Sequence, residues 1–295
     1  MMLKSLVLLC IAVVSAVDLY NDGAVYRSDP TFSIDIPSLL LKEYIRGGSG
    51  GVHIVSAHNK TYTIKFSTDV NHFQEEVLAD KLYDVLGVAT PTFIVLSNIT
   101  QLPLEIRGVV QTAPFVRIAE FVRRVETAPR NYTSEMTHHF EATFVIDAFM
   151  ANRDATKHGN YIYTAEGVFY RIDNGGSLRN RSIGKRKKGT KRSDLWDGQL
   201  IPELKSLPRY NTDLYTDVTA EMIHSQARSI LSKAQAMSKA FKELTVALEI
   251  DEINREAVSQ LITDRLKMLE MLLHPGTSYP ALADRPVSAL SGAGV

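Results

Sequence analysis

Hydrophobic and polar positions alternate in the first third of the chain in a way that predicts a β-rich region with one long helix. In T-Y-T-I-K-F at residues 61–66, every second side chain is apolar, which is typical of a strand with one buried face. The stretch V-H-I-V precedes it, and G-G-S-G-G at residues 47–51 precedes both, so we expect a glycine-tipped hairpin. From Asn71 to Leu86 the apolar residues recur at helical spacing, and Gly87 follows as a helix stop.

Three further apolar runs predict short strands, at Phe93 to Leu96, Gly108 to Val110 and Phe115 to Val122. Residues 17–43 resemble a polar lead-in with short apolar runs. We therefore expect residues 17–122 to form a small α+β lobe that contains the glycine-rich turn.

The second half of the chain has longer helical patterns and predicts a larger, mainly helical lobe over residues 123–274. Its predicted elements are helices at Glu135 to Met150, Val218 to Leu248 and Glu252 to Leu273, and short strands at Tyr161 to Thr164 and Val168 to Ile172. The tail at residues 275–295 consists largely of Gly, Pro, Ala and Ser and is predicted to be disordered.

The N-terminus has the pattern of a secretory signal peptide over residues 1–16. A positive charge at Lys4 precedes an apolar run that ends at Ala16, and this run is too short to span a bilayer of about 30 Å. A buried first helix or strand is the alternative interpretation. We expect export from the cell, residence in the secretory lumen, or delivery into a host cell, and no later segment predicts a membrane span. Four N-x-S/T sequons are candidate glycosylation sites, at Asn59, Asn98, Asn131 and Asn180.

Composition excludes several classes of protein. The 33 Lys and Arg residues balance 33 Asp and Glu residues, so no overall charge favours nucleic-acid binding, and we expect no nucleic-acid partner. A single Cys excludes a disulfide scaffold and a Cys-rich zinc module. Hydrophobic residues make up 45% of the chain, which is enough for a globular core.

Residues suited to binding phosphate occur early in the chain. Lys65 lies on the strand face opposite Tyr62 and Ile64, and it follows the glycine-rich turn, so it could pair with phosphates. The acidic pair Glu75 and Glu76 begins the next helix, where one carboxylate could hold the lysine. Each feature also has a plainer interpretation, namely a flexible turn, an exposed lysine, and acids that favour the helix dipole.

The most specific signal is N-R-D-A-T-K-H-G-N at residues 152–160, followed by R-I-D-N-G at 171–175. Phosphate transfer needs an Asp beside the acceptor hydroxyl and oxygen ligands for a metal, because the metal neutralises phosphate charge. Asp154 suits the first role, and Asn160 and Asp173 suit the second, with Mg²⁺ or Mn²⁺ as the metal. The structural alternative makes Asp154 a cap and Asp173 a turn residue.

The order of these motifs resembles the atypical branch of the protein-kinase-like superfamily, over about residues 45–180. The resemblance rests on the glycine-rich turn, I-K, E-V-L-A-D-K-L-Y-D-V-L-G-V-x-x-P, D-A-F-M-A-N-R-D-x-x-x-x-x-N and I-D-N-G. Within this superfamily the chain resembles actin-fragmin kinase-type and HipA-type catalytic domains, and it resembles phosphoinositide lipid kinases more distantly.

This resemblance implies a two-lobed α+β kinase fold, with a small β-rich N-lobe containing one helix, a larger helical C-lobe, and ATP between the lobes. It implies that Lys65 pairs with the phosphates, that Glu76 holds Lys65, and that Asp154 is the catalytic Asp, with Asn160 and Asp173 on the metal. The resemblance also implies that the glycine-rich turn and the backbone of the hinge segment, Ile118 to Val122, contact the nucleotide. The residues concerned are Gly48, Ser49, Gly50, Gly51, Glu120, Phe121 and Val122.

The chain departs from ordinary protein kinases in its motifs. N-R-D replaces H-R-D, D-N-G replaces D-F-G, and A-P-E is missing. The acceptor therefore stays open among proteins, lipids and small molecules, and AMP transfer is a further alternative. A protein hydroxyl is the acceptor we expect, and a secreted pseudokinase that binds nucleotide or a partner without turnover is the competing hypothesis.

A basic loop at residues 179–192 begins soon after the D-N-G motif. It could attract an acidic peptide, an inositol phosphate or a phospholipid head group, or it could simply be a solvated loop. A glycan on the sequon at Asn180 would obstruct such docking. The cations of the basic loop are Arg179, Arg181, Lys185, Arg186, Lys187, Lys188, Lys191 and Arg192.

Overall fold

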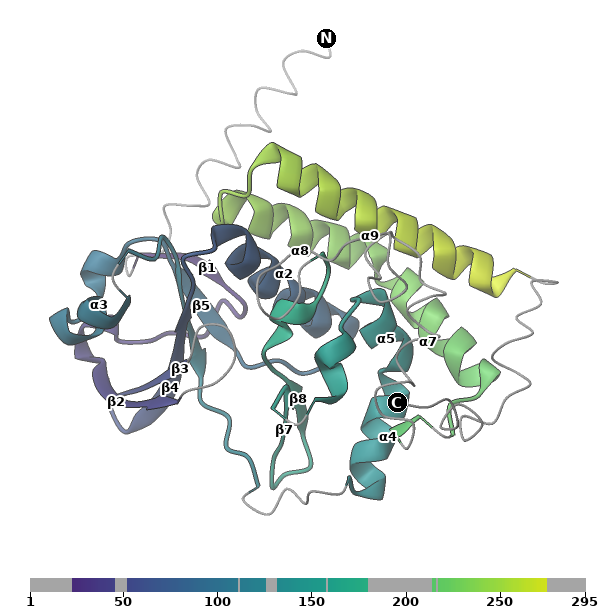
Figure 1. The fold of residues 1–295 in the computed structure, drawn as a ribbon, viewed down its shortest axis with the longest axis horizontal. Coiled ribbons are helices and arrows are strands. Elements are labelled where there is room, and N and C mark those ends of the chain that lie inside the picture. The colour runs from purple at the N-terminus through teal and green to yellow at the C-terminus, as the bar shows by residue number, and fades with distance from the viewer. Residues whose placement is uncertain are drawn as a thin grey trace, which may run out of the picture. The chain divides into compact units, whose positions relative to one another are not determined.

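The computed structural model describes residues 23–45, 52–110, 112–125, 132–157, 159–179, 214–215 and 217–274 (Figure 1). These residues form two compact units. The first contains the described residues up to Val70, with Thr92–Phe121 and Leu244–Glu249, and the second contains Asn71–Pro91, Val122–Glu243 and the residues from Ile250 onward. The signal peptide, the glycine-rich turn, residues 180–213 and the tail lie outside the described residues, and so do the predictions made for them.

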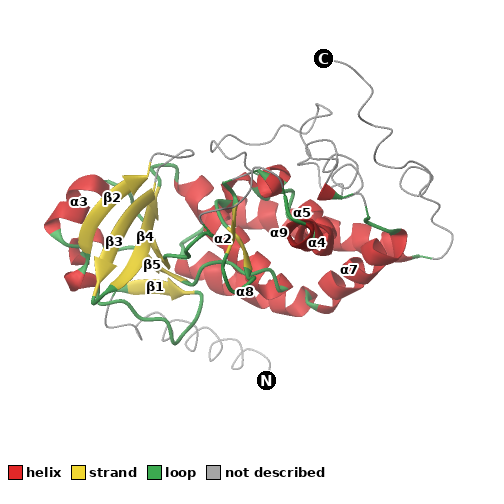
Figure 2. Cartoon of the chain, turned by 90° about the horizontal axis from the view of Figure 1, so that it is seen from below, coloured by secondary structure: helices red, strands yellow, loops and turns green. Residues whose placement is uncertain are grey.

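The first unit is built on one six-stranded sheet with the strand order β1-β5-β6-β4-β3-β2 (Figure 2). All neighbouring strands in this sheet are antiparallel. The strands are β1 (Ala24–Arg27), β2 (Leu40–Ile45), β3 (Val52–Ala57), β4 (Lys60–Phe66), β5 (Phe93–Leu96) and β6 (Val116–Glu120). The segment interpreted as a polar lead-in thus contributes two of these strands, β1 and β2.

Alternation along β4 separates a core face from a second face, as its pattern predicts. Tyr62 and Ile64 are buried in the hydrophobic core and Phe66 packs against it, whereas Thr63 and Lys65 are half-buried on the other face. Further core residues on this side come from residues 34–39, β5 and β6, among them Ile36, Leu39, Ile94, Val116 and Ile118.

The strand predicted at Gly108 to Val110 is wrong, because these residues end the helix α3 (Leu104–Val110). Ile106 and Val110 are buried four residues apart, and Leu102 is buried four residues before Ile106. This spacing fits one face of a helix, and a short apolar run cannot reveal it alone. Short 3-10 helices also occur, namely η2 (Ile36–Ser38), η3 (Ile99–Gln101), η4 (Arg153–Thr156) and η5 (Asn174–Gly176).

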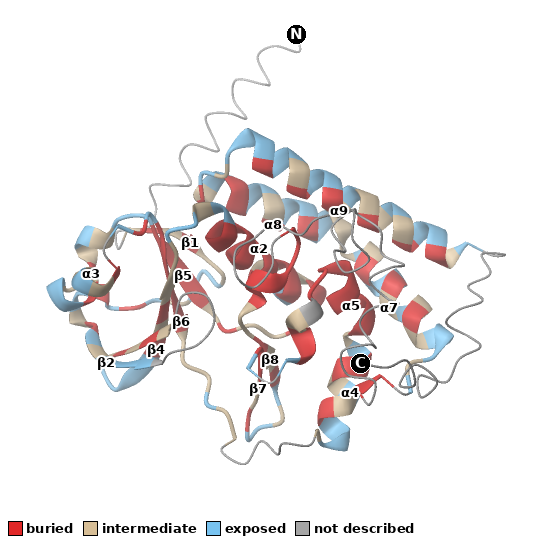
Figure 3. Cartoon of the chain, viewed as in Figure 1, coloured by how far each residue is buried: buried red, intermediate tan, exposed pale blue. Residues whose placement is uncertain are grey.

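The second unit contains most of the helices and one small hairpin. Its strands are β7 (Tyr161–Tyr163) and β8 (Phe169–Arg171), an antiparallel pair that confirms the predicted hairpin. Helix α2 is buried along much of its length (Figure 3). The helices are α2 (Val70–Leu86), α4 (Ser134–Ala142), α5 (Phe144–Phe149), α7 (Ala220–Ser232), α8 (Ala234–Ala247) and α9 (Glu252–Leu273). Helix α2 begins at the last residue of the first unit, and the last turn of α8 belongs to the first unit.

Two predicted helices are each broken into a pair. The chain leaves helical geometry at Thr143, between α4 and α5, where the Gln226 side chain accepts from the N–H of Val145 at 2.9 Å and donates to the carbonyl of Glu141 at 2.7 Å. A second break falls at Lys233, between α7 and α8, and its ammonium donates to the carbonyl of Leu86 at 2.7 Å. A distant side chain therefore binds backbone groups at the first break, and at the second break the side chain of Lys233 reaches a distant backbone carbonyl, neither of which helical periodicity can predict.

Two properties follow from the described residues, namely the length and hydrophobicity of their helices and the exposure of the candidate glycosylation sites. No helix within the described ranges is both long and apolar enough to cross a bilayer. Two of the candidate glycosylation sites are exposed in turns, Asn59 between β3 and β4 and Asn98 just before η3, while Asn131 and Asn180 lie outside the described residues. Glycosylation at any of these sites stays a prediction.

Gly87 ends α2 with a φ of +87°, and a Cβ atom there would lie 3.0 Å from the Lys233 ammonium. We expect Gly87→Ala to lower the free energy of unfolding by about 1–2 kcal/mol, because an L-residue is strained in this left-handed conformation. Gly108 in α3 is the matched control, since a Cβ atom there would meet no other atom within 4 Å and its φ is not positive. Gly108→Ala should raise the free energy of unfolding by about 0.5–1 kcal/mol. Urea unfolding of both variants checks this, and equal changes of one sign would contradict it.

Candidate active site

The loop between α5 and β7 carries Asp154. Three consecutive backbone carbonyls of this loop, from Asp154 to Thr156, each accept a hydrogen bond from a side chain. The carbonyl of Asp154 accepts from the Asn160 side-chain amide at 3.0 Å and from the N–H of Lys157 at 3.0 Å. The next carbonyl, of Ala155, accepts from Arg171 Nη1 at 2.8 Å, and that of Thr156 accepts from the Tyr132 hydroxyl at 2.8 Å. The path of the loop from Asp154 to Thr156 is therefore fixed by specific hydrogen bonds.

Asn160 and the D-N-G motif meet through the backbone. The N–H of Ile172 donates to the carbonyl of Asn160 at 3.0 Å, so Asp173 follows directly after this contact. Asn160 is buried, and its amide nitrogen is committed to the carbonyl of Asp154, which leaves Oδ1 as the atom suited to a metal. Asp173 has a left-handed backbone with φ 52° and ψ 50°, a conformation that Asp and Asn adopt more readily than most residues.

Amide and carboxylate oxygens, such as those of Asn160 and Asp173, are the ligand types that Mg²⁺ takes beside substrate phosphates. Within the described part of the chain, no three His, Cys, Asp or Glu side chains gather as a ready-made metal site. Mg²⁺ usually takes one or two protein carboxylates and keeps water and phosphate oxygens as its other ligands. One amide oxygen from Asn160 and one carboxylate from Asp173 would therefore suffice. Asp154 is half-buried in η4, close in sequence to both the held carbonyls and Asn160.

The asparagine of D-N-G belongs to a buried polar chain that the sequence did not reveal. Asn174 Nδ2 donates to Asp80 Oδ1 of α2 at 2.7 Å, and Asn152 Nδ2 donates to Asn174 Oδ1 at 3.1 Å. Asn152 in turn donates its N–H to the carbonyl of Asp147 in α5 at 2.9 Å. This chain links α2, the D-N-G turn and the start of the Asp154 loop. A buried Asp among the apolar residues of α2 was the available signal.

The glycine of D-N-G lies directly against α2. A Cβ atom on Gly175 would lie 2.6 Å from His72 Nε2 and 3.1 Å from Glu76 Oε2, so the position requires glycine. His72 Nε2 also donates to the carbonyl of Gly175 at 3.0 Å. The carboxylate of Glu76 therefore lies at the D-N-G turn. Its pairing with Lys65, which the resemblance implies, stays a prediction.

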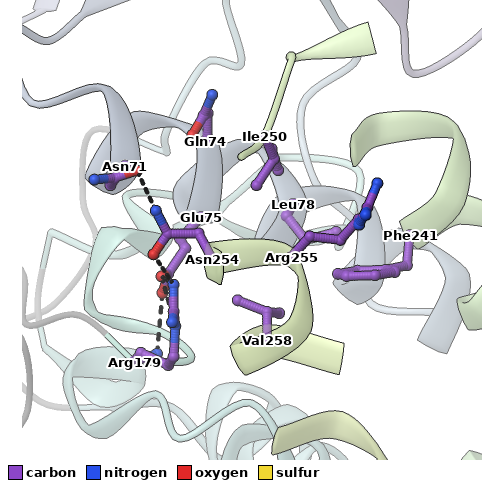
Figure 4. Close-up of a pocket in the computed structure, with 10 residues that line it drawn as sticks. All are labelled: Asn71, Gln74, Glu75, Leu78, Arg179, Phe241, Ile250, Asn254, Arg255 and Val258. Carbon is purple, nitrogen blue, oxygen red and sulfur yellow. Dashed lines mark hydrogen bonds and ion pairs between the residues drawn. The ribbon is translucent and has the colours of Figure 1, made fainter. Parts of the chain in front are cut away.

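The neighbouring Glu75 has a different role, because it forms a buried ion pair with Arg179 (Figure 4). Its Oε1 accepts from Arg179 Nε at 2.9 Å and from Nη2 at 2.5 Å, and its Oε2 accepts from the Arg179 N–H at 3.1 Å. Arg179 Nη2 also donates to Asn254 Oδ1 of α9 at 2.9 Å. A docking role for Arg179 is thus wrong, because its side chain is buried; the other cations of the basic loop lie outside the described residues.

A small pocket adjoins this ion pair, lined also by Asn71, Gln74, Leu78, Phe241, Ile250, Arg255 and Val258 (Figure 4). Its volume is about 10 Å³, which is room for about one water molecule. The pocket is therefore too small to receive a nucleotide or a substrate group.

In the first unit, Lys65 on β4 lies directly opposite Arg117 on β6. Opposed residues of an antiparallel pair share one sheet face, so two cations are neighbours there. The Arg117 guanidinium lies 4.7 Å from the centre of the Phe93 ring, and its side chain is buried. Sequence reasoning missed Arg117, because strand register cannot be derived from the local pattern alone.

The predicted hinge, Ile118 to Val122, begins within β6, and several of its polar groups are already engaged, among them the N–H of Glu120, which donates to the carbonyl of Thr92 at 2.9 Å. The Glu120 carboxylate accepts from the N–H of Thr92 at 2.9 Å, and the N–H of Phe121 donates to the carbonyl of Thr61 at 3.2 Å. An adenine contact in this segment would therefore use other backbone groups. Val122 is half-buried and begins the second unit.

Comparison with known proteins supports the fold. No family model matches the chain, and no curated protein matches it. The crystal structure of the Helicobacter pylori proinflammatory kinase CtkA is similar, with a TM-score of 0.52 and 13% identity over 81% of this chain and 98% of that chain. The chain therefore has a two-lobed, protein-kinase-like α+β fold, with a β-sheet N-lobe and a helical C-lobe.

Two other structures overlap less well. One is described as an aminoglycoside phosphotransferase from Ralstonia eutropha, with a TM-score of 0.34 and 10% identity over 89% of this chain and 98% of that chain. The other is the spectinomycin phosphotransferase APH(9)-Ia, with a TM-score of 0.24 and 12% identity over 74% of this chain and 92% of that chain. These scores are too low to bear on the fold or the chemistry of this chain.

Proposed function

We propose that this protein is a phosphotransferase that moves the γ-phosphate of ATP to a hydroxyl group, with Mg²⁺ or Mn²⁺ as the metal. One observation carries the proposal. Asn160 binds the carbonyl of Asp154 through its side chain and the N–H of Ile172 through its backbone. A carboxylate for proton transfer and two oxygen ligands for a metal thus come from segments joined by hydrogen bonds, within a kinase-like fold.

In the proposed reaction, Asp154 orients the acceptor hydroxyl and takes its proton. The hydroxyl oxygen forms a bond to the γ-phosphorus, the bond between that phosphorus and the bridging oxygen breaks, and ADP leaves. Asn160 Oδ1 and the Asp173 carboxylate would hold the metal, which when bound neutralises charge on the phosphates. The hydrogen bond from the Asn160 amide to the carbonyl of Asp154 keeps the proton acceptor and the metal ligand in one geometry.

For the nucleotide, the proposal takes its residues from the kinase resemblance. Lys65 would bind the α- and β-phosphates, the glycine-rich turn at residues 47–51 would cover them, and the backbone of Glu120 to Val122 would meet adenine. Glu76 at the D-N-G turn would orient Lys65. A protein hydroxyl is the acceptor we propose, and nucleotide binding without transfer is the competing function.

A transfer assay on the purified chain tests the proposal. The protein is incubated with γ-labelled ATP and a generic protein substrate, with Mg²⁺, Mn²⁺ or EDTA, and α-labelled ATP runs in parallel. We expect metal-dependent label from γ-labelled ATP alone, whereas label from the α-position would mean AMP transfer. A metal-dependent thermal shift with ATP but no label would favour the competing function. Neither label nor shift would overturn both.

A further inference from the structure

Arg171 connects the two halves of the proposed catalytic site. It is the last residue of β8, two positions before Asp173, and its side chain is fully buried. Nη1 donates to the carbonyl of Ala155 at 2.8 Å, directly after Asp154. Nη2 donates to the Thr143 hydroxyl at 2.9 Å and pairs with the Asp147 carboxylate.

We propose that Arg171 is a positioning residue that sets the placement of Asp154 relative to Asp173, an inference that rests on the proposed function. Its main chain leads into Asp173, and its guanidinium holds the loop that carries Asp154. A rigid side chain between these two points fixes the separation of the proton acceptor and the metal ligand. A misplacement of about 1 Å at such a site can lower a rate by about 10²-fold.

The shape of arginine suits this task. Its planar guanidinium presents several donors at fixed angles, whereas a lysine ammonium is a point charge on a flexible stem. The rings of Phe140 and Phe169 lie against the group, with their centres 4.9 Å and 5.0 Å from the guanidinium carbon. The donors thus reach a carbonyl, a hydroxyl and a carboxylate at once, which lysine could not reproduce.

Asp147 in turn holds Arg171 from α5. It accepts from the Tyr83 hydroxyl at 2.9 Å and from the Thr143 hydroxyl at 3.2 Å, and the pair with Arg171 has no exposed side-chain surface. Burial raises the pKa of Asp147, while the positive charge of Arg171 and these hydrogen bonds oppose the rise. A buried ion pair of this kind adds little net stability compared with an apolar pair. Its function in this position is better explained by geometry.

Arg265 of α9 provides a matched control. It is also fully buried, and its Nη1 donates to the carbonyls of Ala148 at 2.6 Å and Phe149 at 2.9 Å. These carbonyls lie in α5, before the loop at residues 152–160. Replacing either arginine by lysine therefore disturbs a buried cation, and Arg171→Lys removes the hydrogen bond to the carbonyl of Ala155 in the proposed catalytic loop.

The experiment compares Arg171→Lys with Arg265→Lys in the full chain, at a temperature where both are folded. We expect Arg171→Lys to lower kcat by about 10²-fold with KM for ATP changed by less than about 3-fold, and Arg265→Lys to lower kcat by less than about 3-fold. Amide hydrogen exchange gives a readout that does not depend on activity. It should rise in Arg171→Lys at Lys157, Asn160 and Ile172, whose N–H groups bond within this region, and stay unchanged there in Arg265→Lys.

Equal losses of kcat in the two variants, or unchanged exchange at the three amides in Arg171→Lys, would overturn the inference. If Arg171→Lys fails to fold, Thr143→Val takes its place, because it removes one acceptor of the guanidinium and leaves every charge. It should raise exchange at the same amides, and no rise would again overturn the inference. If the wild-type protein transfers no phosphate, the proposed function fails, and the exchange data still decide whether Arg171 holds the loop.

Discussion

Asp154→Ala is expected to lower the rate of phosphate transfer by about 10²–10⁴-fold while the protein keeps its fold and binds ATP. The reason lies in how the loop is held. The hydrogen bonds from Asn160 and Lys157 reach the backbone carbonyl of Asp154, which alanine retains. The variant therefore loses the carboxylate that takes the proton and keeps the path of the loop.

Initial rates of transfer and ATP-dependent thermal shifts, measured together, check this expectation. Asp84→Ala is the control, since Asp84 is an exposed residue of α2 that pairs with Lys81, and it should leave the rate unchanged. A second variant, Asp173→Asn, keeps a residue that accepts left-handed geometry and removes the charge. It should require at least about tenfold more Mg²⁺ for half-maximal rate, because a carboxylate ligand is lost. An unchanged rate in Asp154→Ala would exclude this residue as the proton acceptor.

Glu75→Ala is expected to lower the free energy of unfolding by about 3–5 kcal/mol. Both partners of the Glu75–Arg179 pair are nearly inaccessible to water, with side-chain exposures of 6% and 3%. Removing the carboxylate leaves the guanidinium buried without its counter-charge, and the remaining bond to Asn254 Oδ1 cannot neutralise it. The loss is therefore far larger than the net contribution of an intact pair.

Urea unfolding measures this change, and two comparisons interpret it. Glu243→Ala removes one partner of an exposed pair with Lys239, whose atoms are 3.9 Å apart, and should cost less than about 0.5 kcal/mol. The double variant Glu75→Ala with Arg179→Met removes the stranded charge and should recover part of the loss. A cost for Glu75→Ala as small as that for Glu243→Ala would mean that water reaches Arg179 readily.

Long periodic elements could be predicted from the sequence, and short ones only in part, since β5, β7 and β8 were predicted but α3 and β1 were not. The alternation in β4, the helical spacing in α2 and the stripe of α9 each run long enough to distinguish one period from another. By contrast, α3 and β1 offer only a few residues each. The break at Thr143 depends on Gln226, which is far away in the sequence.

The candidate site likewise contains residues that the sequence could predict and residues that it could not. The Asp154 loop and the D-N-G turn could be found because their chemistry lies in contiguous motifs. Arg171 and Asp147 escaped notice, because their roles depend on partners that folding brings from α2, α4 and the loop. The sequence does hold a clue in F-V-I-D-A-F, where one acid interrupts an apolar run that is buried throughout. A buried carboxylate needs a partner, but the pattern does not identify which residue provides it.

The chain passes back and forth between the two units, so neither unit corresponds to a continuous stretch that could be cut out. A recombinant fragment ending at Phe121 would carry α2 without Asp147 and Arg179, the partners of Tyr83 and Glu75. The complementary fragment from Val122 would expose those partners with nothing to cover them. Cleavage at this boundary would thus give two pieces that depend on reassembly, and complementation of fragments, rather than isolated domains, is the form in which this protein could be dissected.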